Sequence, residues 1–291
     1  MKTEQRNLHS RDIDLLETIE IVRLMNEEDE TVARAVRDSL PQIAQAVDAI
    51  AGRLNQGGRL FYVGAGTSGR LGVLDAVECP PTFGVSPELV QGILAGGYEA
   101  CYRATEVSED DPQQGKLDLE ERGLAFRDAV VGIAASGRTP YTRGALAYAR
   151  SVKALTVGIS CNRETPISGE VDIAIEVDAG PEVIAGSTRL KAGSAQKMIL
   201  NMISTATMVR LGHVYSNLMV NLHVSNQKLS ERAVRMISEV VPATLDQARQ
   251  ALQETGNVKS AIVMLKLGIT ADHASQLIRD SPNIRKILQE E

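Results

Sequence analysis

Residues 60–70 read Leu60-Phe61-Tyr62-Val63-Gly64-Ala65-Gly66-Thr67-Ser68-Gly69-Arg70, and this stretch decides the fold of the chain. Its first part is a short apolar run with β-branched and aromatic residues, which predicts a buried strand. The glycines that follow let the backbone turn sharply and approach a ligand closely. Thr67 and Ser68 offer hydroxyls and an N-cap for a helix, whose first N–H groups and dipole suit an anion such as phosphate.

The same glycines also satisfy the pattern G-x-G-x-x-G, which is typical of dinucleotide-binding sites. Two features disfavour that alternative. Cys79-Pro80-Pro81 is expected to cut the following helix short, because proline cannot continue a helix. Glu88 precedes the next apolar run instead of ending it, where a ribose-binding carboxylate is expected. The sequence therefore favours a phosphate site over a dinucleotide site.

Apolar runs elsewhere predict further strands, with helical patterns between most of them. The predicted strands cover residues 89–95, 128–134, 154–160 and 173–177. Helices are expected after Ser68 and at residues 98–105, 113–122, 141–150 and about 187–211. Such alternation is typical of a parallel sheet with helices on both faces, so we expect an α/β fold.

Both ends of the chain are predicted to be helical. Residues 1–10 are expected to form a loose arm, followed by helices at 12–25 and about 30–54 with a break at 26–29. Short helical patterns recur near the other end, at residues 232–241, 244–254, 258–267, 271–280 and 284–289. We expect an N-terminal helical segment (1–44), a central α/β domain (45–225) and a C-terminal helical subdomain (226–291).

Composition excludes several classes of function. The 291 residues carry a net charge of −6 without a long Lys/Arg run, which disfavours nucleic-acid and anionic-membrane partners. The aromatic fraction of 3% without Trp disfavours a base-stacking platform. Three cysteines without C-x-x-C spacing and four histidines without ligand spacing favour neither a disulfide framework nor a metal site. A polar N-terminus and the lack of a long apolar stretch predict a soluble, cytoplasmic protein.

Three hydroxyl-rich segments are candidates for phosphate binding. Two of them, residues 66–69 and 136–139, directly follow predicted strands, and the third covers residues 187–191 at a predicted helix start. Ordinary helix capping is the alternative explanation. Ligands bind at the carboxyl ends of parallel strands in open sheets, which favours a phosphate cradle. The candidate ligands are Gly66, Thr67, Ser68, Ser136, Gly137, Arg138, Thr139, Ser187 and Lys191.

Glu78 and Glu109 are candidates for acid–base chemistry. Glu78 adjoins the proline pair and is expected near a helix end, and Glu109 lies in an acidic turn after a strand–helix unit. Two carboxylates can serve as general acid and general base when their environments separate their pKa values. From spacing alone, solvated surface carboxylates remain the alternative.

These segments together resemble the SIS-domain superfamily of phosphosugar-binding proteins and, within it, the N-acetylmuramic acid 6-phosphate etherases. The resemblance rests on residues 64–70, Glu78-Cys79-Pro80-Pro81-Thr82, residues 134–140, residues 158–162 and Lys191-Ala192-Gly193. It extends over nearly the whole chain. It implies a SIS-type parallel sheet between helices, with the catalytic phosphosugar-binding domain at residues 45–225.

The resemblance also implies an activity. Such enzymes remove D-lactate from the muramic sugar and leave N-acetylglucosamine 6-phosphate, in the breakdown and recycling of cell-wall amino sugars, without a metal or organic cofactor. The family's acid position falls on Glu78, which would protonate the departing lactate oxygen. Its second acidic position falls on Glu109, the base for the C2 proton, although the run 108–111 keeps Asp110 as an alternative. A homodimer is implied too, with the apolar helices before Gly57 as candidates for its interface.

Two other functions are compatible with the phosphosugar site. A sensor or regulator would keep the Ser/Thr segments without needing two placed carboxylates, so the presence of Glu78 and Glu109 favours the enzyme. An aldose–ketose isomerase also removes a C2 proton but releases no lactate. Release of D-lactate would therefore separate the three functions.

Overall fold

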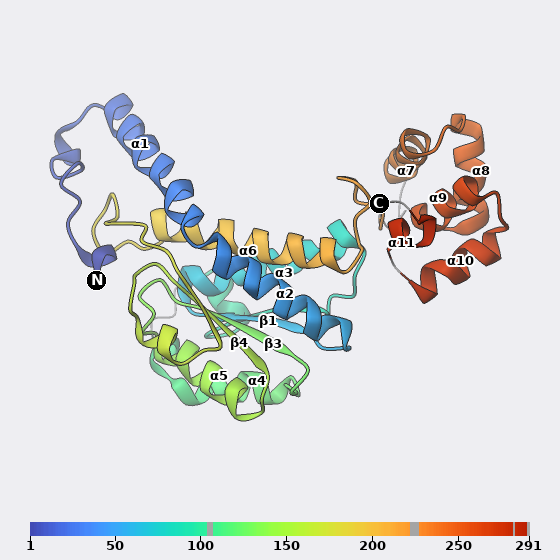
Figure 1. The fold of residues 1–291 in the computed structure, drawn as a ribbon. Helices are drawn as coiled ribbons and strands as arrows, with labels where there is room; N and C mark the ends of the chain where they lie inside the picture. The colour runs from blue at the N-terminus through green and yellow to red at the C-terminus, as the bar shows by residue number, and fades with distance from the viewer. Residues whose placement is uncertain (104–106, 222–226, 282, 290–291) are drawn as a thin grey trace. The chain divides into compact units, whose positions relative to one another are not determined.

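The computed structural model describes residues 1–103, 107–221, 227–281 and 283–289. At its centre is a parallel sheet of five strands in the order β2-β1-β3-β4-β5 (Figure 1). The strands are β1 Leu60–Gly64, β2 Val90–Leu94, β3 Ala129–Ile133, β4 Leu155–Ser160 and β5 Ile173–Glu176. All predicted strands are therefore confirmed, and so is the α/β class.

The strand order reverses between β1 and β3. The chain leaves β1 for β2 on one side and then returns to β3 on the other side, so both strands pair with β1. Gly64 at the end of β1 pairs with Leu94 and with Ile133, which puts the three carboxyl ends in one row. Ligands of open parallel sheets bind at such a reversal point.

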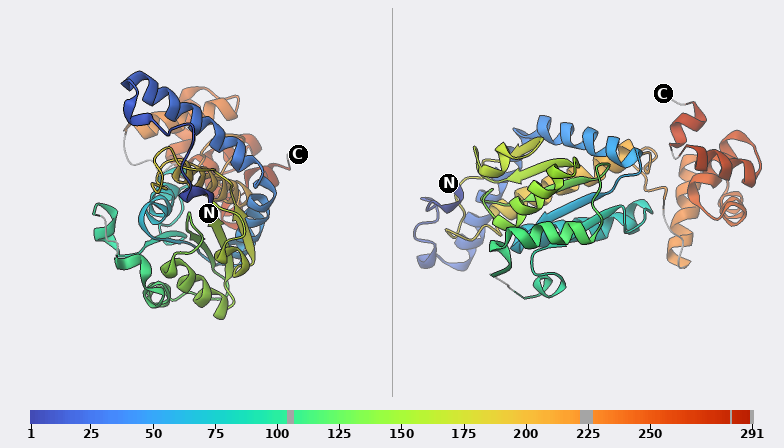
Figure 2. Two further views of the ribbon diagram at one scale, coloured as in Figure 1. Left: turned by 90° about the vertical axis from the view of Figure 1, so that its left-hand side faces the viewer. Right: turned by 90° about the horizontal axis from the view of Figure 1, so that it is seen from below.

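Helices cover both faces of the sheet (Figures 1 and 2). One layer consists of α4 Pro112–Glu121 and α5 Pro140–Ser151. The other consists of α2 Leu40–Asn55, α3 Gly66–Phe83 and α6 Lys191–Arg210. The apolar side chains of β1 and β3 alternate between the layers: Phe61 and Val63 pack with the α4–α5 layer, and Gly72 of α3 lies against Tyr62. A sheet buried on both faces explains why its strands read as continuous apolar runs.

The first long helix runs further than predicted. α1 spans Thr18–Arg37 without interruption, so the predicted break at 26–29 is wrong. Glutamates are good helix formers, and Glu28 of this run is buried. The chain breaks instead at Ser39, the N-cap residue of α2, which begins at Leu40 and has Pro41 in its first turn.

The proline pair also fails to cut its helix short. α3 continues through Pro80 and Pro81 to Phe83. Proline fixes φ near the helical value, and the Gly84 N–H closes the last turn on the Pro80 carbonyl at 2.9 Å. Glu78 therefore lies inside α3, one turn before its end.

Residues 1–10 are not a loose arm. Lys2–Glu4 form a short 3₁₀ helix, and the Thr3 side chain is fully buried. The Thr3 N–H donates to Asn162 Oδ1 at 3.3 Å, and the Ser10 hydroxyl donates to the Val183 carbonyl at 2.7 Å. Contacts more than 150 residues away in sequence thus hold this segment in place.

The chain divides into two compact units. The first, Met1–Val77 with Pro87–Thr205, contains the sheet, and the second comprises Glu78–Ser86 and Ala206–Glu291. The second unit contains the helices α7 Gln227–Val240, α8 Leu245–Thr255, α9 Val258–Leu267, α10 Ala271–Asp280 and α11 Ile284–Leu288. The five short helices predicted near the C-terminus are confirmed.

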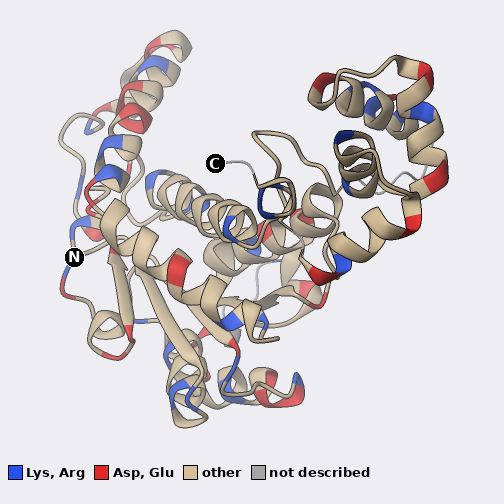
Figure 3. Ribbon diagram, turned by 45° about the vertical axis from the view of Figure 1, so that its right-hand side comes forward, with Lys and Arg blue, Asp and Glu red and all other residues tan. Residues whose placement is uncertain are grey.

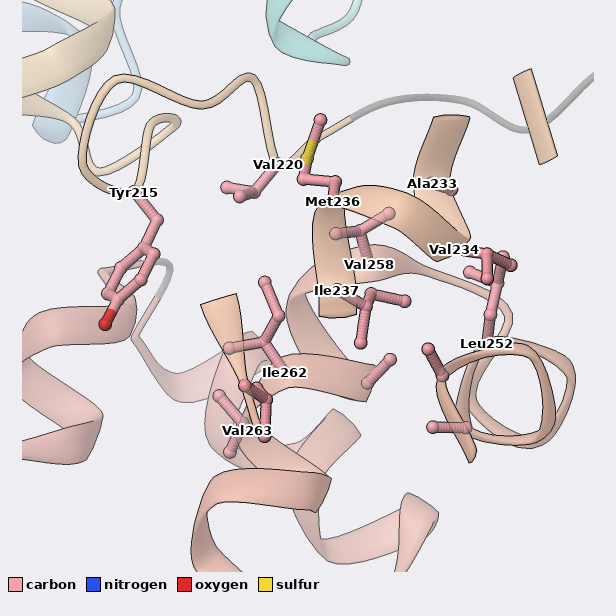
Figure 4. Packing of buried hydrophobic residues seen from close by; sticks show 14 of the residues in the cluster. Tyr215, Val220, Ala233, Val234, Met236, Ile237, Leu252, Val258, Ile262 and Val263 are labelled. Carbon is pink, nitrogen blue, oxygen red and sulfur yellow. The ribbon is translucent and has the colours of Figure 1, made fainter. Parts of the chain in front are cut away.

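The helices of the second unit share an apolar core of their own. Met236 and Ile237 of α7 pack with Val258 and Ile262 of α9, beside Tyr215 (Figure 4). The buried Lys259 ammonium donates to the Gly212 carbonyl at 2.9 Å, which ties α9 to the segment after α6. This unit therefore has a core independent of the sheet.

Charges of both signs are spread over the described elements, and Lys and Arg do not gather on one helix (Figure 3). No helix in the described ranges is long and apolar enough to cross a membrane.

Candidate functional site

Two of the three predicted phosphate segments meet at the reversal point of the sheet. Residues 66–68 follow β1, and residues 136–139 follow β3. β1 and β3 are paired neighbours that end together at Gly64 and Ile133. The structure thus brings the first two predicted segments side by side.

The segment after β1 forms the first turn of α3. Gly66 begins the helix with φ +53, and the next residue, Thr67, is half-buried. The Ser68 hydroxyl donates to Gln196 Oε1 of α6 at 3.0 Å, whereas the Thr67 hydroxyl has no hydrogen bond among the described residues. The first N–H groups of a helix have no partner within it. Thr67 and these N–H groups are thus the donors that this helix start offers to an anion.

The segment after β3 is held in a fixed shape. Gly137 has φ +65, and a Cβ there would lie 2.4 Å from the Thr165 side chain, so only glycine fits. The Arg138 N–H donates to the Ser136 hydroxyl oxygen at 3.2 Å, which leaves the Ser136 proton available to a ligand. Thr139 is the N-cap residue of α5, but its side chain makes no capping hydrogen bond. Ordinary capping therefore does not account for the hydroxyl of Thr139.

The third segment has a different environment. α6 begins at Lys191, and the N–H groups of Lys191 and Ala192 donate to the Glu182 carboxylate at 2.8 and 3.0 Å. A carboxylate of the protein itself therefore occupies this helix start. Ser187 lies half-buried in the turn before it and not at a strand end.

Lys191 is part of a buried ion pair. Its Nζ donates to Glu28 Oε2 at 2.6 Å, and the other Glu28 oxygen lies 2.9 Å from His9 Nδ1. Burial works to raise the pKa of Glu28, but the hydrogen bonds from Lys191 and His9 outweigh it, so the pKa lies below its ordinary value. Burial raises the pKa of Glu182. The Lys191 ammonium is thus already engaged, and its predicted contact with substrate stays a prediction.

Glu109 lies in the 3₁₀ turn Val107–Asp110, and both Glu109 and Asp110 are exposed. The next residue, Asp111, is engaged as the N-cap of α4 and accepts from the N–H groups of Gln113 and Gln114. The 3₁₀ turn contacts α5, the helix that begins after Thr139. Glu109 and Asp110 thus both stay candidates for the base.

Glu78 lies on a solvent-exposed face of α3. Leu74 and Val77 are 49% and 57% exposed, and with Pro81 they line the same face. Glu78 is the first residue of the segment Glu78–Ser86, which belongs to the second compact unit, whereas Gly66 and Thr67 belong to the first.

Asp75, which the sequence analysis did not single out, fastens α3 to α6. Its Oδ1 accepts from Asn201 Nδ2 at 2.7 Å and from the Ser204 hydroxyl at 3.1 Å. Burial raises the pKa of Asp75, while hydrogen bonds from Asn201, Ser204 and Tyr62 work against that rise. Asn201 and Ser204 lie more than 120 residues away in sequence, so no local sequence pattern identifies these contacts of Asp75.

A polar cavity of about 460 Å³ lies at the carboxyl ends of β3, β4 and β5. Ser136 and Arg138 line it together with three residues that the sequence analysis did not name as site residues, Lys2, Asn162 and Arg163. Asn162 and Arg163 lie two and three residues after the end of β4 at Ser160, and that position was the available signal. A second cavity of similar volume lies at the open edge of β2, but none of the predicted site residues lines it.

Family comparisons match the central part of the chain. Residues 42–150 match the glucokinase regulatory protein N-terminal SIS domain, and residues 123–206 match the SIS domain. A phosphoheptose isomerase structure from Francisella tularensis aligns with a TM-score of 0.50 at 17% identity, covering 66% of this chain and 98% of its own. This likeness concerns the fold alone.

Two relatives are similar over almost the entire chain. A protein of Bacillus licheniformis named N-acetylmuramic acid 6-phosphate etherase 1 is 54% identical over 97% of this chain and 93% of its own length. A protein of Clostridium beijerinckii named N-acetylmuramic acid 6-phosphate etherase is 50% identical over 100% of this chain and 96% of its own length.

Proposed function

The chain belongs to the N-acetylmuramic acid 6-phosphate etherase family, and from this premise we propose its reaction and the residues that perform it. It cleaves the lactyl ether of N-acetylmuramic acid 6-phosphate and yields D-lactate and N-acetylglucosamine 6-phosphate. The observation that carries this function is identity of at least half of the residues over nearly the full length of such relatives. The reaction serves the breakdown and recycling of cell-wall amino sugars.

The phosphate is bound where β1 and β3 end. Thr67, Ser136 and Thr139 supply hydroxyls, and the first N–H groups of α3 supply further donors. Gly66 lets the backbone approach the phosphate, Gly137 lets the segment after β3 pack against Thr165, and Ser68 holds the start of α3 through its hydrogen bond to Gln196. Binding a remote phosphate positions C2 and C3 of the open-chain sugar for reaction.

The chemistry is an elimination followed by a hydration. Glu109 takes the C2 proton, which the adjacent aldehyde acidifies, and the electron pair expels the lactyl oxygen from C3. Glu78 donates its proton to that oxygen, because an alkoxide is a poor leaving group. The ionised Glu78 then takes a proton from water as the water adds to C3 of the unsaturated aldehyde, and the protonated Glu109 returns its proton to C2. Asp110 remains the alternative base.

We also propose that the enzyme is a homodimer whose site needs both chains. One observation supports this: Glu78 shares an exposed face of α3 with Leu74 and Val77. An exposed apolar helix face indicates a contact surface. A second copy that covers this face would bring its phosphate segments to Glu78.

The remaining proposals concern organisation and location. The catalytic domain covers residues 45–225, between an N-terminal helical segment and a C-terminal helical subdomain. The protein works in the cytoplasm on a small phosphosugar, without a nucleic-acid or membrane partner. The charge balance of −6 supports the absence of a nucleic-acid partner.

One incubation tests the function. The protein is mixed with N-acetylmuramic acid 6-phosphate, and D-lactate and N-acetylglucosamine 6-phosphate are measured over time. Equal molar release of both products is expected. Binding without turnover would indicate a sensor, and conversion of a simple hexose phosphate without lactate would indicate an isomerase.

A further inference from the structure

The polar cavity beside the predicted phosphate segments is lined by two arginines whose guanidinium groups have no partner among the residues that the structure describes. Arg138 follows β3 and Arg163 follows β4, and both side chains line the cavity of about 460 Å³. Neither guanidinium forms a hydrogen bond or an ion pair with any residue that the structure describes. The Lys2 ammonium, which also lines the cavity, is already paired with Asp178 at 2.5 Å.

The charge of the cavity suits an anion. Once Lys2 and Asp178 neutralise each other, the lining groups leave three cations, Arg138, Arg163 and the α-ammonium of Met1, and one anion, Glu164. The planar fork of arginine also matches a carboxylate in two parallel hydrogen bonds.

The two arginines sit on loops that are joined to each other. Asn162 Nδ2 donates to the Ala135 carbonyl at 3.0 Å, and the Ile167 N–H donates to the Gly137 carbonyl at 3.1 Å. Glu164, in the loop after β4, adopts φ +53, a costly conformation for a residue other than glycine. Asn162 also donates to the Thr3 hydroxyl at 2.9 Å, so the N-terminal segment forms one wall of the cavity. A rigid frame of this kind lowers the entropy cost of binding.

We propose that this cavity binds the carboxylate of the substrate's lactyl group through Arg138 and Arg163. The proposal rests on the etherase function, since it assigns the second anion of that substrate. The phosphate occupies the hydroxyl segments at β1 and β3, and the carboxylate occupies the neighbouring arginine pair. The subsite thereby distinguishes the muramic substrate from an N-acetylglucosamine phosphate, which lacks the lactyl group.

The test compares two substrates. One is N-acetylmuramic acid 6-phosphate, and the other is its lactamide, in which a neutral amide replaces the carboxylate. Arg163→Gln should lower kcat/KM for the acid about tenfold to a hundredfold, the effect of losing a hydrogen bond to a charged group. It should change kcat/KM for the lactamide less than about twofold. Arg138→Gln should show the same selectivity.

Two controls make the result specific. Arg127→Gln removes an exposed arginine just before β3, at the amino end of the sheet, and should leave both substrates unaffected. Inhibition by N-acetylglucosamine 6-phosphate, which carries the phosphate alone, should be unchanged in Arg163→Gln.

Equal losses for acid and lactamide, or no loss for either, would overturn the carboxylate subsite. Weaker inhibition by N-acetylglucosamine 6-phosphate in Arg163→Gln would overturn it as well, since the arginine would then serve the phosphate. The wild-type enzyme is assayed first. Absence of lactate release there would refute the etherase function itself, so the two failures are distinguishable.

Discussion

Lys191 and Glu28 form a buried ion pair in which Nζ and Oε2 lie 2.6 Å apart, joining the start of α6 to α1. Their side chains are only 4% and 10% exposed. The same turn of α6 donates its backbone N–H groups to Glu182. These contacts fix the entry of α6 and the preceding turn that contains Ser187.

We expect Lys191→Met to destabilise the protein by about 3–5 kcal/mol, because it leaves Glu28 buried without its partner. Urea unfolding followed by circular dichroism measures the change. Arg103→Gln is the matched control, since its ion pair with Glu99 is exposed and worth about 1 kcal/mol or less. Equal effects of the two substitutions would show that the buried pair is not stabilising.

His213 makes the second unit sensitive to acid. Burial, assisted by the charge of Lys259, lowers the pKa of His213 to about 4, and Asn221 Nδ2 lies 2.7 Å from its Nδ1. Since the folded pKa lies below the unfolded value of about 6.5, stability is present above pH 6.5 and is lost as the pH falls toward 4.

His213 should therefore remove about 2 kcal/mol of stability between pH 7 and pH 5. His213→Gln cannot titrate and should remove this part of the pH dependence. The unfolding midpoints of the wild type and of His213→Gln are measured at both pH values. Carboxylates contribute the same pH dependence to both proteins, so the difference between the two proteins isolates the contribution of His213. Parallel pH curves would contradict the assignment.

Local patterns predicted the sheet and the positions of two hydroxyl-rich segments at strand ends, because both depend on neighbours in sequence. The apolar run of β1 predicts a strand from its residue types alone, whatever the strand packs against. Ser136 lies three residues after the end of β3, so its place at the strand end also follows from the sequence. Long-range contacts decided the rest. The local sequence around Glu28 predicted a polar break, because its ion-pair partner Lys191 lies 163 residues away in sequence. The hydrogen bond from Asn162 to Thr3 likewise joins residues 159 positions apart.

Removing single hydroxyls tests the phosphate segments. Ser136→Ala and Thr139→Val should each weaken substrate binding about tenfold to a hundredfold, because a hydrogen bond to a charged group contributes about 1.5–3 kcal/mol. Ser151→Ala is the control, since that hydroxyl donates to the Tyr148 carbonyl at the far end of α5. Inhibition by N-acetylglucosamine 6-phosphate measures the binding. Unchanged inhibition in both variants would show that the cradle is misassigned.

Deuterium exchange separates the roles of the two carboxylates. Glu78→Ala should stop lactate release but still exchange the C2 hydrogen in deuterated water, because proton abstraction needs only the base. Glu109→Ala should lose both exchange and elimination. A general acid or base contributes about 10²–10⁴-fold, so the losses are measurable by NMR and by a lactate assay.

The pattern of surviving exchange also identifies errors in the assignment. Exchange in Glu109→Ala but not in Glu78→Ala would reverse the two roles. Exchange in both variants would indicate another base, and Asp110→Asn is then the first substitution to combine with Glu109→Ala.

Mixing two inactive variants tests whether one site uses both chains. If Glu78 acts on the site of the partner subunit, a mixed dimer of Glu78→Ala and Glu109→Ala contains one intact site and one doubly defective site. Half of the dimers are mixed after free subunit exchange, so about a quarter of the wild-type activity should return. The control mixes Glu78→Ala with Glu78→Gln, in which every site lacks the acid and no activity should return. Lack of recovery in the first mixture, with subunit exchange verified by mass spectrometry of the intact dimers, would place both carboxylates in the same chain's site.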